Sequence, residues 1–466
     1  MTSPTADVLA HLQANRPLAL ERLFEFLRIP SVGPDPEHDG DTRRAAEMIA
    51  ADLNTFGMNA EVRTTPGHPM VVAHDPGPGT GPTILYYGHY DVQPPDPIEL
   101  WDAPPFEPTL VGEGDDERVV ARGAVDDKGQ LMTFIEAMRA WKAVHGSLPI
   151  TVKILLEGEE ESGSPSLEPF LKENAEELAA DICIVCDTGM WDKKTPAITY
   201  MLRGLLYVQI TVKGPSHDLH SGMYGGGVVN PNNALAQMIA ALHDDEGRVT
   251  IPGFYDDVAE LSDEERTAWE GLGFDDAAFL ATAGLVDGHG EQGYSLLERT
   301  WSRPTLDVNG MWGGYTGDGA KTVIPSEAHA KISCRLVPNQ DPEKILAALT
   351  SHLTALAPKG CEVIVDAMDG SPAHRVNTDS PFLGAMIAGL EEVFPNKAQL
   401  IGTGGSIPLV GSMHDILGLD ALLVGFALDD DRMHSPNEKF NTCCFYNGMN
   451  AQAAIIGQLA QLGGTE

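Results

Sequence analysis

Basic residues are scarce in this chain, whose 466 residues include 30 Lys and Arg against 68 Asp and Glu. The formal net charge of -38 repels nucleic acids and anionic membrane surfaces, so we expect neither as a partner. Long apolar runs are missing from the sequence as well, and no stretch reaches the length that crosses a bilayer. Residues 1–7 lack the basic and apolar regions of a secretory signal. These features predict a cytoplasmic protein.

Cysteine is also rare, and six cysteines in so long a chain do not make a disulfide framework. Cys183 and Cys186 have C-x-x-C spacing, but they lie in a strand-like run, where residues three apart face opposite sides. We expect two buried thiols there, and packing roles for Cys443 and Cys444. This usage of cysteine favours a reducing compartment.

Acidic residues and histidines stand at the ends of several strand-like runs. The apolar run 150–156 leads into Glu159, Glu160 and Glu161, and adjacent carboxylates of this kind call for a compensating cation such as a metal ion. Three further runs end similarly: 83–88 before His89 and Asp91, 181–186 before Asp187, and 421–426 shortly before His434. A single acidic cluster is typical of a solvated surface. Four coincident strand ends instead predict a site, because ligands bind at the carboxyl edge of open α/β sheets.

The length predicts two domains. Strands and helices alternate up to about residue 200, which predicts an α/β fold with a mixed, mostly parallel sheet sandwiched by helices. The pattern changes to α+β after Gly204. We predict a catalytic domain formed by residues 1–204 and 377–466, with an inserted domain at 205–376.

Local patterns predict individual elements. Apolar residues at helical spacing predict one amphipathic helix over residues 7–28 and another over 45–56. In the insert, Asn230 followed by Pro231 is typical of a helix start. The insert's remaining elements are expected as strands at 205–214, 328–337 and 361–365 and a helix at 342–357.

The strand ends carry residues suited to a metal centre. His89 and Asp91 are two apart, so an extended backbone points both to one side, where His89 can bind a metal while Asp91 holds the other ring nitrogen. The loop 121–130 adds Asp126 and Asp127. One of these can cap the following helix while the other bridges two cations.

The candidate ligands are His89, Asp126, Glu160 or Glu161, Asp187 and His434. Nitrogen and oxygen ligands without a thiolate fit Zn²⁺, with Mn²⁺ or Co²⁺ as alternatives, and two imidazoles disfavour Mg²⁺ and Ca²⁺. One glutamate of the pair would bind metal while the other takes a proton from the attacking water. The residues alone do not say which glutamate does which.

These residues form motifs in a specific order. They are Gly88-His89-Tyr90-Asp91-Val92-Gln93-Pro94, Asp126-Asp127-Lys128-Gly129, Glu160-Glu161-Ser162-Gly163-Ser164, Asp187 and His434-Ser435-Pro436-Asn437-Glu438. Through them the chain resembles the M20 family of dinuclear metallopeptidases. Three further segments resemble the carnosine and cytosolic non-specific dipeptidase branch: Asp218-Leu219-His220-Ser221-Gly222, Ala320-Lys321-Thr322-Val323-Ile324-Pro325 and Gly404-Gly405-Ser406-Ile407-Pro408.

The resemblance implies roles for the site residues. It implies two divalent metals per subunit, one held by His89 and Asp187 and the other by Glu161 and His434, with Asp126 bridging. It also implies that Glu160 is the general base and that Asp91 orients His89. Glu159 has no fixed counterpart in the family and is left out of the site.

The family's lid domain corresponds to the predicted insert. The resemblance implies that His220 and Thr322 reach the active site of a partner subunit, and that Arg335 and Ser406 bind the substrate carboxylate and polar backbone. A homodimer through the lid is expected, also because the helix over 230–243 has apolar surface to bury. Residues 368–374 depart from the branch, which has a His-Gly-Gly element there, and His374 is the possible replacement. This departure leaves the preference for substrate side chains open.

The expected activity is hydrolysis of the amide bond of dipeptides or short peptides with a free carboxyl terminus. An N-acyl amino acid deacylase of the same family is the alternative, because both reactions split an amide. A catalytically silent binding protein is disfavoured, since every ligand and the base are present.

Overall fold

The computed structural model describes residues 4–405 and 408–463. These residues form two compact units. Unit 1 comprises the described residues of Met1–Tyr200, Val376–Ile401 and Ser412–Glu466. Unit 2 comprises those of Met201–Arg375 and Gly402–Gly411, so it is inserted within unit 1 along the chain.

A nine-stranded mixed sheet has the order β1-β2-β6-β3-β7-β17-β8-β15, with β16 beside β8. Its strands are β1 (Glu61–Arg63), β2 (Met70–Asp75), β3 (Thr83–His89), β6 (Thr151–Glu157), β7 (Ile182–Val185), β8 (Ala197–Leu202), β15 (His374–Arg375), β16 (Gln399–Thr403) and β17 (Ala421–Val424). The central strands β6, β3, β7 and β17 pair in parallel, and β2 and β8 pair antiparallel on either side of them. Every residue of β7 and β17 is buried, as expected for parallel strands covered on both faces. The predicted mixed α/β fold is confirmed.

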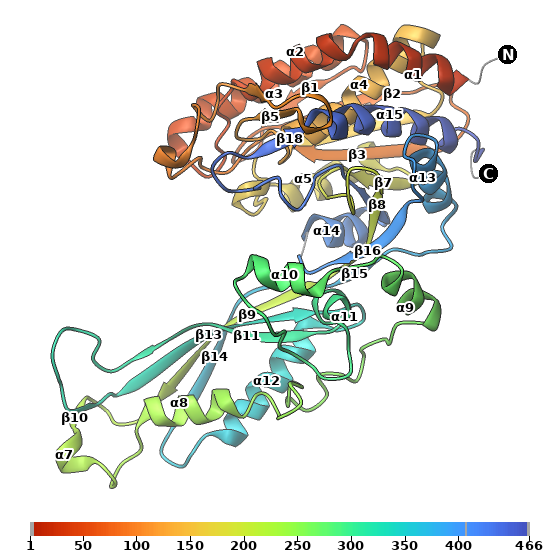
Figure 1. The fold of residues 1–466 in the computed structure, drawn as a ribbon. Helices are drawn as coiled ribbons and strands as arrows, with labels where there is room; N and C mark the ends of the chain where they lie inside the picture. Colours follow the sequence, from red (N-terminus) through yellow and green to blue (C-terminus); the bar gives the residue numbers. More distant parts are fainter. Residues whose placement is uncertain (1–3, 406–407, 464–466) are drawn as a thin grey trace. The chain divides into compact units, whose positions relative to one another are not determined.

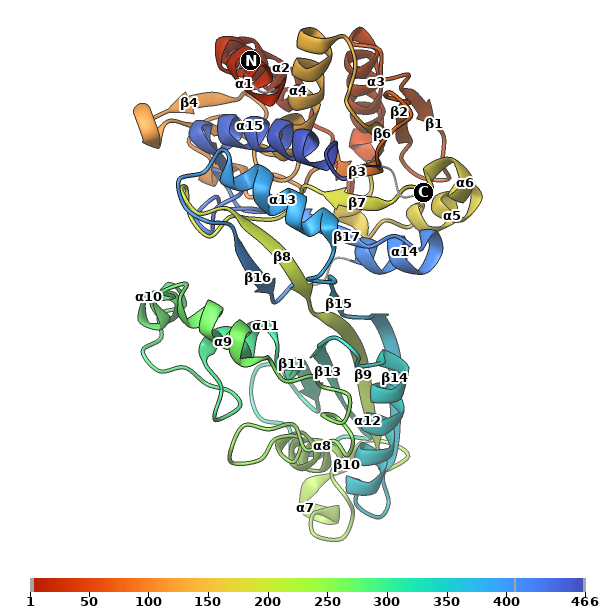
Figure 2. The same ribbon diagram turned by 90° about the vertical axis from the view of Figure 1, so that its right-hand side faces the viewer.

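Helices cover both faces of this sheet (Figures 1 and 2). The helices α4 (Lys128–His145) and α15 (Thr442–Leu459) pack against each other on one face, and α15 also contacts α1 (Pro4–Ala14) and α13 (Pro381–Glu391). On the same side, α3 (Asp39–Thr55) packs against β2. The opposite side carries α5 (Leu167–Glu173), α6 (Ala175–Leu178) and α14 (Pro408–Leu417), all of which are labelled in Figure 2.

The predicted single helix over residues 7–28 is wrong. The structure has α1 ending at Ala14 and a separate helix, α2 (Arg16–Leu27), with Asn15 between them. Pro17 lies in the first turn of α2, where its missing N–H costs nothing, whereas inside a continuous helix it would break a hydrogen bond. The second predicted helix also begins earlier than expected, at Asp39.

A second, three-stranded sheet in unit 1 has the order β18-β5-β4. Its strands are β18 (Lys439–Asn441), β5 (Arg118–Val120) and β4 (Thr109–Val111). The antiparallel pairing of β18 with β5 places Lys439 opposite Val120. This small sheet therefore brings the loop before β18 beside the loop after β5.

Unit 2 is built on a four-stranded antiparallel sheet of order β11-β13-β9-β14. The strands are β9 (Gly204–Lys213), β11 (Thr305–Gly313), β13 (Glu327–Leu336) and β14 (Glu362–Ser371). Alternate residues of β9 and β13 form an apolar core with α8 (Pro231–Ala240) and α12 (Pro342–Leu356). As predicted, α8 starts after Asn230, whose side chain accepts a hydrogen bond from the N–H of Asn232.

The remaining elements of unit 2 are short. A two-stranded sheet pairs β10 (Leu219–His220) with β12 (Val323–Ile324), and α7 (Ser221–Tyr224) follows β10. The acidic stretch contains α9 (Asp263–Glu270), α10 (Asp276–Thr282) and α11 (Leu296–Trp301). Among the described residues of the whole chain, no helix combines the length and apolar character needed to cross a membrane. All six cysteines are free, and Cys183 and Cys186 are buried as predicted.

Candidate dinuclear metal centre

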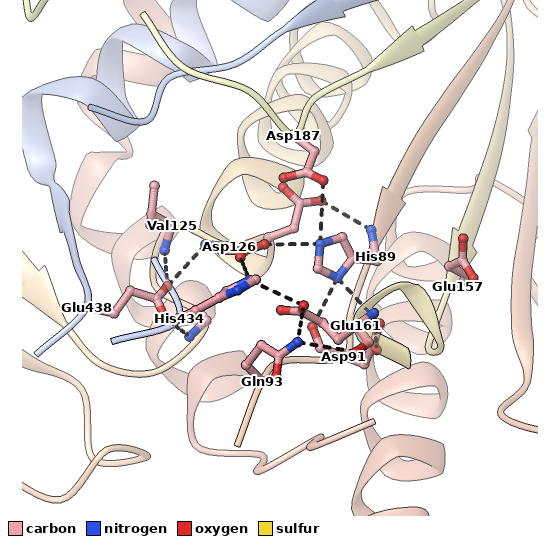
Figure 3. Close-up of polar contacts among 12 residues, drawn as sticks. His89, Asp91, Gln93, Val125, Asp126, Glu157, Glu161, Asp187, His434 and Glu438 are labelled. Carbon is pink, nitrogen blue, oxygen red and sulfur yellow. Dashed lines mark hydrogen bonds and ion pairs between the residues drawn. The ribbon is translucent and has the colours of Figure 1, made fainter. Parts of the chain in front are cut away.

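The candidate ligands converge at one edge of the large sheet (Figure 3). His89 is the last residue of β3, and Glu160 and Glu161 open a short 3-10 turn just beyond β6. Asp187 follows β7, and His434 lies in the loop after β17. Because these four strands are parallel neighbours, their carboxyl ends share one edge, which brings together residues from distant parts of the sequence.

The ligand atoms form two groups that share Asp126. In the first group, Nε2 of His89 lies 3.2 Å from Oδ1 of Asp126 and 3.7 Å from Oδ2 of Asp187. In the second, Nε2 of His434 lies 2.8 Å from Oδ2 of Asp126 and 3.3 Å from Oε2 of Glu161. Within each group the candidate ligand atoms all lie within 4.8 Å of one another. The two oxygens of Asp126 therefore serve different groups.

The buried atoms of these groups fit divalent metal ions. Oε1 of Glu161 is buried and has no hydrogen-bond partner in the described part of the chain. The contacts of the buried Nε2 of His89 with Asp126 and Asp187 lack hydrogen-bond geometry. A buried polar atom without a partner is costly, and three carboxylates near two imidazoles leave negative charge to be compensated. The donor set is imidazole nitrogen and carboxylate oxygen, which suits zinc and similar ions.

The electrostatics of the ligand side chains point the same way. Hydrogen bonds from His434 to Asp126 and Glu161 raise the pKa of His434 to about 10. Burial works to raise the pKa of Asp126, but His434 and His89 outweigh it and lower that pKa. Burial raises the pKa of Asp187, and the carboxylates of Asp126 and Glu160 add to this against the opposing effect of His89. Protonated imidazoles thus balance part of the negative charge of the carboxylates, and bound divalent cations would balance more of it.

Asp91 lies against the other nitrogen of the His89 ring. Its Oδ1 is 3.4 Å from Nδ1 of His89, and its main-chain oxygen is 3.1 Å from the same atom. Its Oδ2 accepts a hydrogen bond of 3.1 Å from the N–H of Glu161. Asp91 is fully buried, so it contacts ligands of both groups without solvent competition.

The three consecutive glutamates occupy different environments. Glu161 contacts His434, whereas Glu160 belongs to neither ligand group within the described residues. Burial raises the pKa of Glu160; His89 opposes this shift, and Glu161 adds to it. The Oε1 of Glu159 accepts from the N–H of His68 at 3.0 Å, and its Oε2 accepts from Ser166 at 3.1 Å. Glu159 therefore links the backbone of His68 to that of Ser166.

The idea that one of Asp126 and Asp127 caps the following helix is wrong. Asp127 occupies the N-cap position of α4, but its side chain makes no capping hydrogen bond. Its Oδ2 instead accepts a hydrogen bond of 3.2 Å from the N–H of His89. The peptide bond between Asp126 and Asp127 is cis.

No role was assigned from the sequence to two neighbours of the ligands, Gln93 and Glu438. Nε2 of Gln93 donates a hydrogen bond of 2.8 Å to Oε2 of Glu161. The spacing of residues 89, 91 and 93 along extended chain could have indicated it, because alternate residues face one side. Glu438 accepts hydrogen bonds from the backbone beside Asp126, and no local pattern marks that role.

The predicted substrate residues described by the structure lie in unit 2. His220 and Thr322 lie close together, since the N–H of Ser221, the residue after His220, donates a hydrogen bond of 3.0 Å to the main-chain oxygen of Thr322. Nδ1 of His220 accepts from the N–H of Gly222 at 3.0 Å. Arg335 lies on β13. The burial of Arg203 and the positive charge of Arg335 lower the pKa of Arg203 to about 10. Ser406 lies outside the described residues.

The stretch that departs from the dipeptidase branch is also in unit 2. Met368 and Asp369 are exposed on β14. His374 lies on β15 opposite Leu202 of β8.

Known proteins share this fold and are similar in sequence over nearly the whole chain. The sequence profile of peptidase family M20/M25/M40 matches residues 85–458. The Cys-Gly metallodipeptidase dug1 of Schizosaccharomyces pombe is 32% identical over 457 residues, which cover 95% of each chain. The solved structure of the di-peptidase Dug1p from Saccharomyces cerevisiae is 29% identical, with a TM-score of 0.79 over 99% of each chain.

A carboxypeptidase is similar to a comparable degree. The M20 family metallo-carboxypeptidase Sso-CP2 from Sulfolobus solfataricus is 34% identical, with a TM-score of 0.79 over 95% of this chain and 99% of that one. The chain belongs to peptidase family M20/M25/M40, as its motifs predicted. It is accordingly a peptide-bond hydrolase of a family that uses divalent metals.

Proposed function

We propose that this protein hydrolyses the amide bond of dipeptides that carry a free terminal carboxylate. The observation that carries the proposal is the sharing of Asp126 between two groups that each pair a histidine with a carboxylate. Relatives aligned over nearly the whole chain support the substrate class, since they are named Cys-Gly metallodipeptidase and Beta-Ala-His dipeptidase. The deacylase alternative has no comparable support.

The proposed metal content is two divalent ions per chain, most simply Zn²⁺. His89 and Asp187 would hold one ion, Glu161 and His434 the other, and Asp126 both. The absence of thiolates from both groups also permits Mn²⁺ or Co²⁺. Bound ions of this kind polarise the scissile carbonyl and lower the pKa of the attacking water.

Glu160 is the proposed general base. Its carboxylate would take a proton from the attacking water and deliver it to the nitrogen of the departing amine. Its raised pKa brings it closer to neutrality, where a base both accepts and releases a proton efficiently. Asp91 would hold the proton on Nδ1 of His89, which leaves Nε2 free to bind metal.

Residues of unit 2 are proposed to bind the substrate. Arg335 offers a planar fork for the substrate carboxylate, and Ser406 would bind the polar backbone of the substrate. Because Nδ1 of His220 accepts from Gly222, its neutral ring carries the proton on Nε2, which can donate to the developing oxyanion. Thr322 would contact the substrate next to His220.

A homodimer is proposed in which His220 and Thr322 serve the active site of the other subunit. Exposed apolar side chains of unit 2, including Met223, Tyr224 and Trp312, support an interface there. A cytoplasmic location is proposed as well, and the six unpaired cysteines fit a reducing compartment.

A substrate panel tests the reaction. The zinc-loaded protein would be offered Cys-Gly and β-Ala-His, their N-acetylated forms, and N-acetyl and N-carbamoyl amino acids, with release of free amino acid as the readout. Faster turnover of the free dipeptides is expected. Preference for the N-acyl amino acids would establish the deacylase instead, and no hydrolysis of any member by the metal-loaded protein would refute the proposal.

A further inference from the structure

Two buried charged residues beside the metal groups have no part in the chemistry proposed above. The side chains of Arg122 and Glu438 are 1% and 0% exposed, and Nη1 of Arg122 donates a hydrogen bond of 2.7 Å to Oε2 of Glu438. Arg122 precedes Asp126 on the loop after β5, and Glu438 follows His434 on the loop before β18. The ion pair therefore joins the two loops that carry these ligands.

The carboxylate of Glu438 also holds the backbone around Asp126 (Figure 3). Its Oε1 accepts hydrogen bonds from the N–H groups of Val125 at 2.9 Å and Asp126 at 3.1 Å. Its Oε2 accepts from the N–H of Gly123 at 3.0 Å in addition to Arg122. A carboxylate offers about four lone-pair sites, so the four donors use its full capacity.

Arg122 extends the connection to a third segment. Its Nη2 donates a hydrogen bond of 3.2 Å to the main-chain oxygen of Pro94, the last residue of the motif that contains His89. Its guanidinium also lies 5.5 Å from the ring centre of Trp101. One buried ion pair thus touches the segments that position His89, Asp126 and His434.

The loop of His434 depends on such outside support. His434 and Asn437 have φ angles of 58° and 61°, in the left-handed region that non-glycine residues rarely adopt. Residues held in such conformations persist when surrounding contacts fix them. The side chain of Asn437 holds this loop by accepting a hydrogen bond from the N–H of Asp102, and the adjacent Glu438 holds it by accepting one from the N–H of Gly123.

We propose that Glu438, together with Arg122, is a positioning residue that sets the spacing of Asp126 and His434 and thereby the affinity of the second metal site. The inference rests on the proposed dinuclear function. Residues that orient metal ligands typically change affinity by about 10–100-fold when they are replaced, which gives the expected size of the effect.

A second buried carboxylate that pairs with arginine separates this role from ordinary stabilisation. Glu136 on α4 is buried in the same unit, and its Oε1 accepts from Nε of Arg22 at 2.6 Å and from Nε of Arg139 at 3.3 Å. It belongs to neither metal group. Glu136→Gln therefore reports the loss of a buried carboxylate without disturbing the ligand loops.

The test compares Glu438→Gln with Glu136→Gln in the full-length protein. Zinc affinity would be measured by competition with a chromophoric chelator, and folding by thermal denaturation of the metal-free protein. Both variants are expected to melt at lower temperature. Only Glu438→Gln is expected to bind one of its two zinc ions about 10–100-fold less tightly than the wild type does, and excess zinc should restore part of its activity.

Two results would overturn the inference: unchanged zinc affinity in folded Glu438→Gln, or an equal loss of affinity in both variants. If Glu438→Gln does not fold, Arg122→Lys replaces it. This variant keeps the charge but loses the planar fork, and it should weaken zinc binding by about 10-fold, the lower end of the range for residues that orient ligands. Wild-type protein that binds no zinc would instead refute the proposed function, which distinguishes the two failures.

Discussion

Oδ2 of Asp126 lies 2.8 Å from Nε2 of His434, although the two residues are far apart in the sequence. The other oxygen of Asp126 lies 3.2 Å from Nε2 of His89. One side chain therefore belongs to both candidate metal groups, whereas each histidine belongs to one. This asymmetry distinguishes the effects of replacing the individual ligands.

Removing His434 should empty one site, and removing the Asp126 carboxylate should weaken both. His434→Ala is expected to retain one tightly bound zinc per chain, because His89 and Asp187 remain. Asp126→Ala should lose tight binding at both sites. Elemental analysis after removal of free metal measures the stoichiometry, with the exposed His145→Ala as a control. Equal zinc content in His434→Ala and wild type would rule out the ligand assignment.

Replacing Glu160 should separate metal binding from turnover. Glu160→Gln is expected to bind zinc normally but to lose about 10²–10⁴-fold in kcat, because the amide cannot accept the proton of the attacking water. Steady-state kinetics and zinc titration on the same preparation measure both. The adjacent Glu159→Gln is the control. It should lower the melting temperature and change kcat little, since Glu159 accepts hydrogen bonds from two neighbouring loops. A near-normal kcat for Glu160→Gln would show that another group is the base.

Acid should oppose zinc binding through the histidines. In the metal-free protein Asp126 and Glu161 raise the pKa of His434 to about 10, so its ring is protonated at neutral pH and must lose that proton to bind metal. Zinc affinity is therefore expected to rise with pH between 6 and 9. The stability that protonated His434 gives the metal-free protein has the opposite trend: it is complete below the ordinary histidine pKa and is lost as pH rises through about 10.

Isothermal titration with zinc at several pH values tests this trend. His434→Ala should release fewer protons per chain on zinc loading, because the site of His434 is lost, whereas the remaining site keeps His89 and should still bind more tightly as pH rises. An affinity that does not change with pH in the wild type would contradict protonation of the ligands.

Glu157 should make stability depend on pH in a defined window. Burial raises the pKa of this fully buried carboxyl from 4.5 to about 8, while the hydroxyl of Tyr87 donates a hydrogen bond to it. The folded state then holds a proton that the unfolded state releases, so stability should fall as pH rises from 4.5 to 8. One pKa unit corresponds to about 1.4 kcal/mol, which makes the expected contribution several kcal/mol.

Glu157→Gln should remove that part of the pH dependence, because an amide stays neutral. Urea unfolding from pH 5 to 9 is the measurement, and the exposed Glu176→Gln serves as the control. The Gln variant should gain stability relative to wild type toward pH 9. Parallel curves for the variant and the wild type would mean that Glu157 is ionised in the folded protein throughout.

Mixing two inactive variants should restore activity if His220 acts across a dimer. His220→Ala lacks the proposed oxyanion donor, and Glu160→Gln lacks the base. A mixed dimer would contain one intact site, so random reassociation of equal amounts should recover about a quarter of wild-type activity. Either variant reassociated with itself provides the control. No recovery from demonstrated mixed dimers would place His220 in the active site of its own subunit, and a fully active monomer would exclude the dimer.

The sequence by itself determined the strands and the residues that end them. The apolar runs before His89, Glu160 and Asp187 form β3, β6 and β7, because alternation and β-branched content are local properties of a strand. The start of α8 after Asn230 was equally local. The break between α1 and α2 was missed although Pro17 marked it, since the apolar spacing continued across the proline.

Only the tertiary structure decided what each acidic side chain contacts. It put Glu161 beside His434, turned Asp127 toward the backbone of His89, and set Glu438 against the N–H groups of Val125 and Asp126. Each of these contacts joins segments far apart in the sequence, and each depends on how loops pack at the edge of the sheet. Local propensity contains no information about such distant partners. The residues themselves could therefore supply the candidate ligands, whereas their grouping was implied only by the resemblance to a known family.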